Sequence, residues 1–306
     1  EVHNSLPSHE KTKKVIATDL DVPWDIIKHG DLFYISERPG RILKITSNGK
    51  AENMPLDLKK EIVQNGEGGL LGFVLSRDFN TSKTAYIYHT YRQADELFNR
   101  IVKLKWAEKR WVEQDILLDN IPGASIHNGG RLKIGPDGHL YVTTGDANVS
   151  ENAQDPDSLS GKILRMNVDG SIPETNPYPG SYVYSYGHRN PQGLAWGEDG
   201  TMYSAEHGST AHDEINLIQP GKNYGWPVIR GAETKKGMVT PLYHTRQETL
   251  APSGLAYYAG DLYAAGLRGE QILRFNIHNH TPNMIFQGIG RLRDIIVRDG
   301  FAYVIT

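Results

Sequence analysis

The sequence predicts an all-β protein, a six-bladed β-propeller of four-stranded antiparallel blades. A unit made of a short apolar strand, a tight turn and a second strand carrying an aromatic residue occurs six times. No segment shows a convincing 3.6-residue apolar period, which would indicate a helix. The composition agrees, because 32 glycines, 16 prolines and 16 tyrosines favour short strands joined by turns.

The six repeat units follow one another along the whole chain. They read VPWDIIKHGDLFYISE, GGLLGFVLSRDFNTSKTAYIYHT, GGRLKIGPDGHLYVTTG, PQGLAWGEDGTMYSAEH, PSGLAYYAGDLYAAG and LRDIIVRDGFAYVIT. Five turns (KHGD, GPDG, GEDG, YAGD and VRDG) hold the glycine that a tight hairpin needs for its positive φ. The aromatic anchors recur every 40 to 62 residues, room for about four strands per blade; they are Phe33, Tyr86, Tyr141, Tyr203, Tyr263 and Tyr303.

A third strand follows five of the units, with the sequences GRILKI, NRIVKLKW, GKILRMN, DEINLI and EQILRFN. The sixth unit reaches Thr306 without one, so we expect the last blade to lack a C-terminal strand in this chain. The segment KKVIATDL (13–20) is a candidate for the outer strand that closes the ring on the last blade. No low-complexity linker divides the sequence, so we favour one propeller domain over residues 1–306. The alternative is an irregular sandwich or two small β domains.

Composition excludes several functions. A net charge of −3 and a pI near 6.5 give no field that attracts nucleic acid or an anionic membrane. No run approaches the roughly 18 apolar residues of a membrane helix, so we expect no membrane-spanning segment. The absence of cysteine rules out disulfides, thiolate catalysis and thiolate-bound metals.

The phase of the repeat places a polar site at one mouth of the central channel. In a propeller the first strand of each blade lines the channel, and the hairpin returns the end of the second strand to the face where the first began. Before the first strands lie Glu67, His127, Asn128, Arg189, Asn190, Gln192, Ser253, Arg291 and Arg293; after the second strands lie Arg38, Asp146, Glu206, His207 and Arg268. Up to five arginines at one mouth indicate a multiply anionic ligand, because guanidinium groups bind carboxylates and phosphates bidentately.

His127 is the candidate base of this site, and Asp146 is its candidate partner. The imidazole titrates near neutral pH, and an antiparallel register could bring the Asp146 carboxylate to it, where it would fix the tautomer. The run EHGSTAHDEINLIQPGKNYGWP (206–227) offers carboxylates and carbonyls, the ligands that calcium prefers, although without the spacing of an Asp-rich calcium loop.

At these residues the sequence resembles the soluble, pyrroloquinoline quinone (PQQ)-dependent glucose and aldose sugar dehydrogenases, a family of six-bladed propellers. The matching runs, in order along the chain, are GEGGLLG, HNGGRLKIGPDGHLYVTTGDA, GKILRMN, YGHRNPQGLAW, EHG with DEINLI, GKNYGWP, APSGLAYY and GRLRDII. The short loops look closer to the aldose sugar dehydrogenase branch than to the larger glucose enzyme.

The resemblance implies calcium-assisted oxidation of an aldose at its anomeric carbon to a lactone. His127 would be the base that takes the proton of the anomeric hydroxyl as hydride passes to PQQ, and Asp146 would orient it. The implied cofactor contacts are Arg189, Asn190, Gln192, Arg268, Arg291 and Arg293, with Glu67 where several relatives have glutamine. An activating calcium would bind the carbonyls of Gly208 and Ser209, and a structural calcium would bind Glu214 and the Tyr224 carbonyl.

The resemblance also implies an extracytoplasmic location, periplasmic or secreted, for a monomer or homodimer. It leaves the electron acceptor unknown. Two alternatives remain at the level of the sequence: a calcium-dependent propeller hydrolase such as a lactonase, and a non-catalytic interaction propeller. An arginine ring argues against the first because it would repel a central metal ion, and a retained base beside anion-binding arginines argues against the second.

Overall fold

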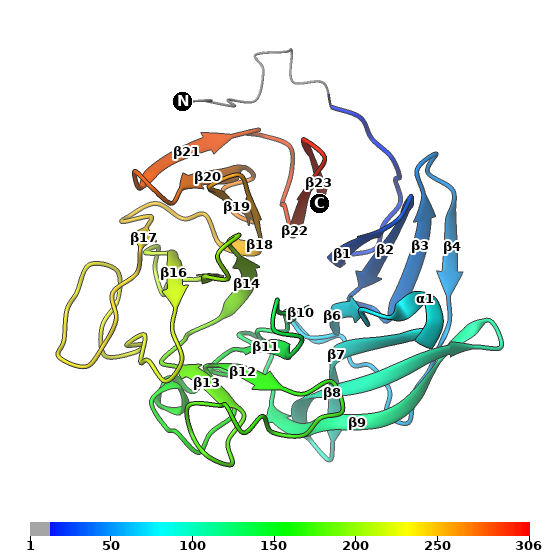
Figure 1. Ribbon diagram of the computed structural model, residues 1–306, viewed down its shortest axis with the longest axis horizontal. Helices are drawn as coiled ribbons and strands as arrows, with labels where there is room; N and C mark the ends of the chain where they lie inside the picture. Colours follow the sequence, from blue (N-terminus) through cyan, green and yellow to red (C-terminus); the bar gives the residue numbers. More distant parts are fainter. Residues whose placement is uncertain (1–12) are drawn as a thin grey trace.

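Small antiparallel sheets stand in a ring around a central axis in the computed structural model (Figure 1), which describes residues 13–306. Within these residues, five sheets have four or more strands and a sixth has two. The first strands of the six sheets (β1, β6, β10, β14, β18 and β22) lie nearest the centre. The prediction of an all-β propeller is therefore confirmed, and within residues 13–306 the last sheet is one hairpin.

The strands have the following bounds. The first sheet contains β1 (Pro23–His29), β2 (Leu32–Glu37), β3 (Arg41–Thr46) and β4 (Ala51–Met54). The second contains β6 (Leu70–Leu75), β7 (Thr84–Gln93), β8 (Glu96–Ala107) and β9 (Arg110–Pro122), with the short β5 (Leu56–Asp57) parallel to β9. The third contains β10 (Leu132–Ile134), β11 (Leu140–Thr144), β12 (Lys162–Met166) and β13 (Val183–Tyr186).

The remaining sheets continue around the ring. The fourth contains β14 (Pro191–Trp196), β15 (Met202–Glu206), β16 (Glu214–Ile218) and β17 (Tyr243–His244). The fifth contains β18 (Pro252–Tyr258), β19 (Asp261–Gly266), β20 (Ile272–Asn276) and β21 (Thr281–Ile285), and the sixth contains β22 (Asp294–Arg298) and β23 (Phe301–Ile305). The helical elements are α1 (Phe79–Ser82) and a 3₁₀ turn (Ser150–Ala153), and no helix in residues 13–306 has the length and apolarity to cross a membrane.

The turn chemistry read from the sequence produces the hairpins. The last glycine of each of the five turns adopts positive φ: the values are 57° at Gly30, 86° at Gly138, 83° at Gly200, 83° at Gly260 and 76° at Gly300. Side chains with a Cβ rarely adopt this conformation, so these positions favour glycine. All six aromatic anchors lie on the second strand of their sheets.

The segment 13–20 forms no strand, so the prediction that it is the outer strand of the last blade is wrong. Asp19 has φ 63°, which interrupts an extended conformation. Ile16, Ala17 and Leu20 instead pack against an apolar cluster that contains Ile305. The segment therefore covers the junction of the first and sixth sheets with side chains rather than with a hydrogen-bonded ladder.

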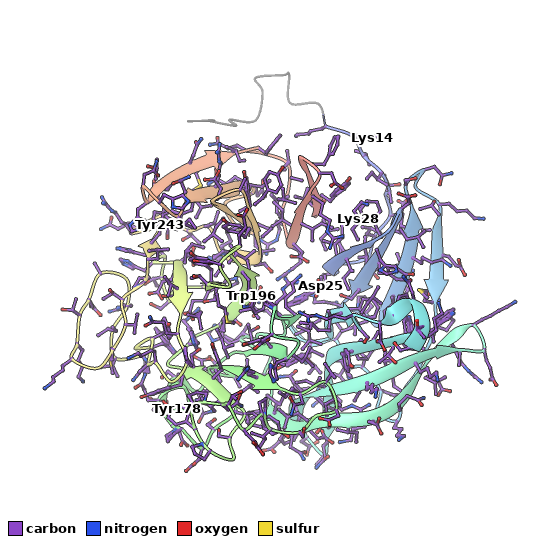
Figure 2. All side chains as sticks on the ribbon, in the orientation of Figure 1. Lys14, Asp25, Lys28, Tyr178, Trp196 and Tyr243 are labelled. Atoms are coloured by element: carbon purple, nitrogen blue, oxygen red, sulfur yellow. The ribbon has the colours of Figure 1, made fainter. Side chains whose placement is uncertain are left out.

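A fully buried arginine joins the sheets at the propeller axis. The Nη1 atom of Arg131 lies 3.1 Å from Asp25 Oδ1 and 3.1 Å from Asp294 Oδ2, and its Nε donates to the Gln192 carbonyl at 2.7 Å. Its guanidinium also lies 4.1 Å from the ring centroid of Trp24. Figure 2 places the Asp25 label near the centre of the ring. One side chain thus links the first, third, fourth and sixth sheets.

The two carboxylates extend this connection through backbone N–H groups. Asp25 Oδ2 accepts from Phe73 N at 3.1 Å, in the second sheet, and Asp294 Oδ2 accepts from Ile26 N at 3.0 Å, across the closure of the ring. Burial, with the nearby Asp294 charge, raises the pKa of Asp25 to about 7, although Arg131 opposes the shift. Arg131 and the Ile26 N–H keep the pKa of Asp294 low.

The raised pKa of Asp25 predicts a pH-dependent stability. An aspartate in the unfolded chain titrates near pH 4, so the native state holds the extra proton between about pH 4 and pH 7. The stabilisation is complete below this window and is lost as the pH rises through it. We expect the free energy of unfolding of Asp25→Asn, relative to wild type, to improve as the pH rises from 5 to 8. Urea titrations at several pH values measure this difference, and a constant difference would contradict it.

Candidate functional site

The loops before the first strands and after the second strands of the blades meet at one mouth of the channel. His127 precedes β10 and Asp146 follows β11, and the pairing of Leu132 with Val142 brings the two loops together. His127 Nδ1 lies 2.7 Å from Asp146 Oδ1. Because an ionised carboxylate only accepts, this contact places the imidazole proton on Nδ1 and leaves Nε2 as the basic atom. Among residues 13–306, no group forms a hydrogen bond with this Nε2.

The close approach of these loops depends on a glycine. A Cβ on Gly145 would lie 1.9 Å from the carbonyl oxygen of His127, a distance that no side chain tolerates. His127 itself adopts φ 59°, and its backbone N donates to Glu67 Oε2 at 3.0 Å. The carboxylate of Glu67 therefore binds the backbone of the candidate base, a contact that the sequence did not predict.

Asp146 is buried and holds three hydrogen bonds. Its Oδ1 accepts from His127 and from Asn148 N at 2.9 Å, and its Oδ2 accepts from the indole Nε1 of Trp226 at 2.8 Å. Three donors on its two oxygens hold the carboxylate in one orientation. Asp146 is thus built to orient His127.

Two partly buried arginines, Arg38 and Arg293, lie near this pair, and Arg291, which is exposed, lies close to both of them. Burial and the cations Arg38 and Arg131 lower the pKa of Arg293 to about 9. Burial lowers the pKa of Arg38, with Arg291 adding to the effect and Glu67 opposing it. Arg293 Nη1 donates to Gln192 Oε1 at 3.1 Å. Like charges held this close and partly out of water are unfavourable without a counter-anion.

The fourth sheet contributes Arg189 and Asn190. The Arg189 guanidinium lies 5.3 Å from the ring centroid of Trp226, and burial lowers the pKa of Arg189 while Asp146 opposes the shift. Asn190 Oδ1 accepts from Gly129 N at 3.0 Å. Arg268, in contrast, is exposed, and within residues 13–306 no hydrogen bond or ion pair joins its side chain to another residue of the predicted site.

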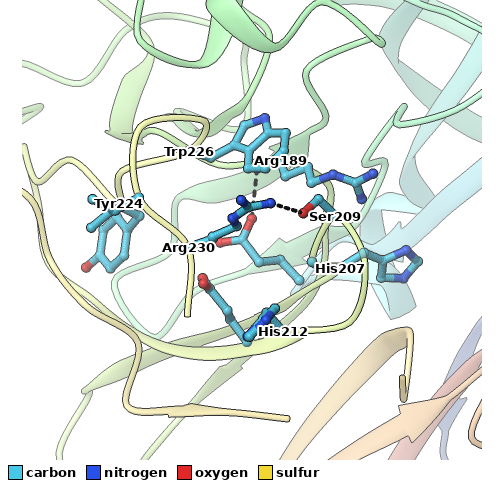
Figure 3. A pocket seen from close by; sticks show the side chains of 11 residues that line it. Arg189, His207, Ser209, His212, Tyr224, Trp226 and Arg230 are labelled. Carbon is cyan, nitrogen blue, oxygen red and sulfur yellow. Dashed lines mark hydrogen bonds between the residues drawn. The ribbon is translucent and has the colours of Figure 1, made fainter. Parts of the chain in front are cut away.

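All four predicted metal ligands line one cavity of about 20 Å³. These residues are Gly208, Ser209, Glu214 and Tyr224, which the sequence motifs divided between two calcium ions. Glu206, His207 and His212 complete part of the wall (Figure 3). Burial and the charge of Glu206 raise the pKa of Glu214 to about 8. The volume suits one ion or one water molecule.

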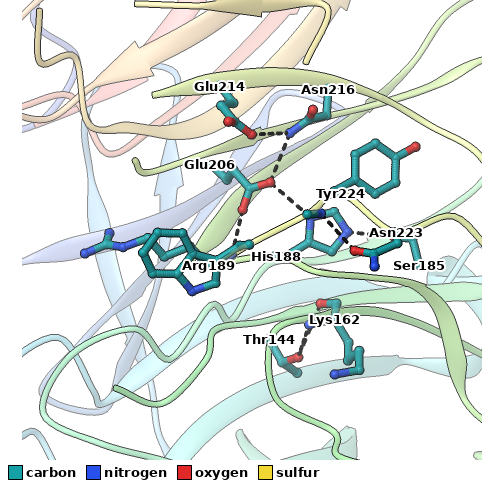
Figure 4. A network of polar contacts seen from close by, with 12 residues as sticks. Thr144, Lys162, Ser185, His188, Arg189, Glu206, Glu214, Asn216, Asn223 and Tyr224 are labelled. Atoms are coloured by element: carbon teal, nitrogen blue, oxygen red, sulfur yellow. Dashed lines mark hydrogen bonds and ion pairs between the residues drawn. The ribbon is translucent and has the colours of Figure 1, made fainter. Parts of the chain in front are cut away.

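Glu206 is the centre of a buried polar network behind this cavity (Figure 4). Its Oε1 lies 3.0 Å from His188 Nδ1 and accepts from Asn216 Nδ2 at 3.0 Å, and its Oε2 accepts from Arg189 N at 2.9 Å. His188 Nε2 lies 2.8 Å from Ser185 Oγ. Ser185, His188 and Glu206 have the order of contacts of a hydrolytic triad, but Ser185 and His188 are 0% exposed, so no substrate can reach them.

The comparisons with known proteins show the family of this chain. The family model described as glucose/sorbosone dehydrogenase matches residues 20–306. The chain belongs to this family. Quinoprotein glucose dehydrogenase B of Acinetobacter calcoaceticus is 33% identical over 81% of this chain, which spans 60% of that protein's length. Aldose sugar dehydrogenase YliI of Escherichia coli strain K12 is 29% identical over 96% of this chain and 89% of its own.

A solved structure shows the same fold at high similarity. The PQQ-bound form of aldose sugar dehydrogenase from Streptomyces coelicolor has a TM-score of 0.87 and 37% identity, covering 92% of this chain and 86% of the other. The resemblance read from the motifs is therefore confirmed at the level of the family.

For this glucose/sorbosone dehydrogenase family member, the sequence located most of the mouth but missed some of its residues. Trp226 and Arg131 received no role, although both lie inside matching motifs (GKNYGWP and GGRLKI). His207 was placed at the mouth without a role. Burial and the cations Arg293 and Arg189 lower its pKa to about 3, so the imidazole stays neutral. The one signal in the sequence for the contacts of Trp226, Arg131 and His207 is the recurrence of polar residues at the ends of the strands.

The buried Ser185 tests whether the network around Glu206 is structural or catalytic. Ser185→Ala leaves His188 Nε2 without its partner, and we expect a loss of about 1–3 kcal/mol in the free energy of unfolding. Urea denaturation measures it, with the exposed turn variant Ser47→Ala as the matched control. Equal stabilities of the two variants would contradict the structural role, and loss of a hydrolase activity in Ser185→Ala would assign the residue to catalysis.

Proposed function

We propose that this protein oxidises aldose sugars at the anomeric carbon to lactones, with PQQ as the oxidant and calcium as an assisting ion. The observation that carries the proposal is the oriented His127–Asp146 pair beside a cluster of partly buried arginines. The pair supplies a base, His127, whose Nε2 has no hydrogen-bond partner among residues 13–306. The arginine cluster supplies a site for a multiply charged anion. The named relatives are glucose and aldose sugar dehydrogenases, and one is described as PQQ-bound.

Unpartnered polar atoms support the fit of this cofactor. Among residues 13–306, buried side-chain atoms without a hydrogen-bond partner include five at the predicted mouth; they are Arg38 Nε, Arg189 Nε, Asn190 Nδ2, His207 Nε2 and Ser253 Oγ. The arginine, asparagine and serine atoms can donate a hydrogen bond, and such atoms are unfavourable unless a ligand accepts from them. A tricarboxylate with quinone oxygens supplies both acceptors and negative charge, so the residues present suit PQQ.

The residues divide the work between proton removal and binding. His127 Nε2 takes the proton of the anomeric hydroxyl, and Asp146 stabilises the imidazolium that results. Arg38, Arg189 and Arg293 hold the anionic ligand and stabilise charge that develops on it. Bound PQQ would accept the hydride that leaves the anomeric carbon.

The cavity between Gly208 and Tyr224 would hold the calcium ion. Two carboxylates, Glu206 and Glu214, lie at its wall with Ser209, and oxygen atoms of this kind are the ligands that calcium prefers. Arg189 and Arg230 also line the cavity, so the two carboxylates would have to offset their charge. A cation there would also stabilise the charged form of Glu214, which burial and the charge of Glu206 disfavour. A bound calcium ion would polarise a nearby oxygen as a Lewis acid.

The two alternatives from other functional classes have less support. A propeller hydrolase needs a central metal held by several side-chain carboxylates and amides, and the arginines at the mouth, Arg38, Arg189 and Arg293, would repel such an ion. A purely binding propeller gives no reason for the carboxylate that orients His127. We further propose an extracytoplasmic location from the family resemblance; the electron acceptor and the choice between monomer and homodimer stay open.

Reconstitution tests the proposed reaction directly. With PQQ and calcium, the wild-type protein should reduce an artificial dye in the presence of an aldose. His127→Ala should lose turnover by at least about 10²-fold, because a general base contributes ~10²- to 10⁴-fold, while PQQ binding, followed by its absorbance, stays intact. The exposed variant His278→Ala is the matched control. Wild-type protein that binds PQQ without oxidising any sugar of a panel, or that does not bind it, would refute the proposal.

Calcium binding gives a second test. Calcium at about 100 times its Kd should add about 2.7 kcal/mol to the stability of the wild type. Glu214→Gln should lose most of this gain, because it removes a charged ligand but keeps an acceptor for the Gly231 N–H. Scanning calorimetry with and without calcium measures the effect, and the exposed Glu174→Gln is the control. Equal gains in all three proteins would place the ion elsewhere.

A further inference from the structure

Trp226 contacts both Asp146, the partner of the proposed base, and Arg189, one of the arginines proposed to hold the anionic ligand. It lies in the loop between β16 and β17 of the fourth sheet, and its indole Nε1 donates to Asp146 Oδ2, a third-sheet residue, at 2.8 Å. Asp146 is 2% exposed, so water cannot replace this donor easily. The contact spans 80 residues of sequence.

The contact acts on His127 through the carboxylate. Asp146 uses Oδ1 for the imidazole and Oδ2 for the indole, so the two rings bind opposite oxygens. A donor to the ionised carboxylate stabilises its charge. Removing that donor makes the carboxylate a stronger acceptor, which favours the protonated imidazole and frees the carboxylate to rotate.

The backbone of Trp226 is held on both sides. Its N donates to the Gly187 carbonyl at 2.9 Å, and its carbonyl accepts from Gln154 Nε2 at 2.7 Å. Gln154 and Asn223 also exchange two amide hydrogen bonds, at 3.0 and 2.8 Å. The 3₁₀ turn before Gln154 is fixed by Lys162, whose Nζ donates to the Asn152 carbonyl at 2.8 Å. The indole is therefore placed by a rigid set of contacts.

The face of the same indole supports Arg189. The guanidinium lies 5.3 Å from the ring centroid, within the range of a cation–π contact, and Figure 3 shows the two side chains together at the cavity. Arg189 Nε has no partner among residues 13–306 and remains available to a ligand. The N–H at the edge of the ring thus binds Asp146, the partner of His127, and the face of the ring contacts Arg189.

We propose that Trp226 is a positioning residue that sets the orientation and basicity of His127 through Asp146 and holds Arg189 through its ring. The inference rests on the proposed function and extends it to a residue that does not touch the reacting atoms. A purely structural tryptophan would change stability alone.

The test separates the edge of the ring from its face. Trp226→Phe keeps a ring under Arg189 and removes the N–H. We expect kcat to fall roughly 10-fold through misplacement of the base, the acid limb of the kcat/KM profile to move to higher pH, and PQQ affinity to stay unchanged. Trp226→Leu should in addition weaken PQQ binding by roughly 2- to 30-fold, the value of a cation–π contact. Trp106→Phe, in an apolar cluster of the second sheet, is the control.

A readout without cofactor makes the test independent of turnover. The His127 ring resonances, followed by NMR against pH in the cofactor-free protein, should titrate with a midpoint at higher pH in Trp226→Phe than in wild type and Trp106→Phe. A shifted midpoint in a protein without dehydrogenase activity would uphold the role of Trp226 and refute the proposed function. An unmoved midpoint with unchanged pH profile would overturn the inference, even if Trp226→Phe were less stable.

Discussion

The buried ion network around Arg131 is the constraint on which the rest of the molecule depends. A propeller has no central layer of its own, so the inner strands of separate sheets must be held together at the axis. Arg131 does this with two carboxylates and a backbone carbonyl, and the carboxylates bind further N–H groups of neighbouring sheets. Breaking such a network by removing one partner leaves a buried charge, which typically costs about 3–5 kcal/mol.

The functional mouth is built on this network. Gln192 connects the Arg131 network to the mouth, because its carbonyl accepts from Arg131 and its side chain accepts from Arg293. At the mouth the protein has partly buried cations and hydrogen-bond donors without partners, and both lower its stability. A ligand that binds the native state alone offsets this cost by mass action. The same features that lower the stability of the protein are the ones on which the proposed anionic ligand depends.

The sequence predicted the parts of the structure that depend on local chemistry. Turns such as GPDG and GEDG determine hairpins by themselves, and the hairpin register follows, which is why His127 and Asp146 could be paired from the sequence alone. Contacts between distant segments left no such signal. Asp25 and Asp294 meet only because the ring closes, and Trp226 reaches Asp146 from a loop without regular structure. The segment 13–20 looked like a strand by composition, but Asp19 bends it away from pairing.

The residues predicted to bind calcium give a second example of a contact between loops that the sequence did not predict. The family resemblance assigned Gly208 and Ser209 to one calcium ion and Glu214 and Tyr224 to another, and in the fold all four residues line one cavity. Spacing along the chain cannot show that two loops approach each other. Burial and, after it, the charge of Glu206 raise the pKa of Glu214, and both depend on the folded arrangement.

A crystal structure of the protein with PQQ and calcium tests the central claim most directly. We predict the quinone at the mouth, its carboxylates within hydrogen-bond distance of Arg293 and of Arg38 or Arg189, and its reactive carbonyl on the side of His127 Nε2. Cofactor bound instead in a second cavity, whose lining includes Lys133 and Arg298, would contradict this prediction. So would a mouth that stays empty at saturating PQQ.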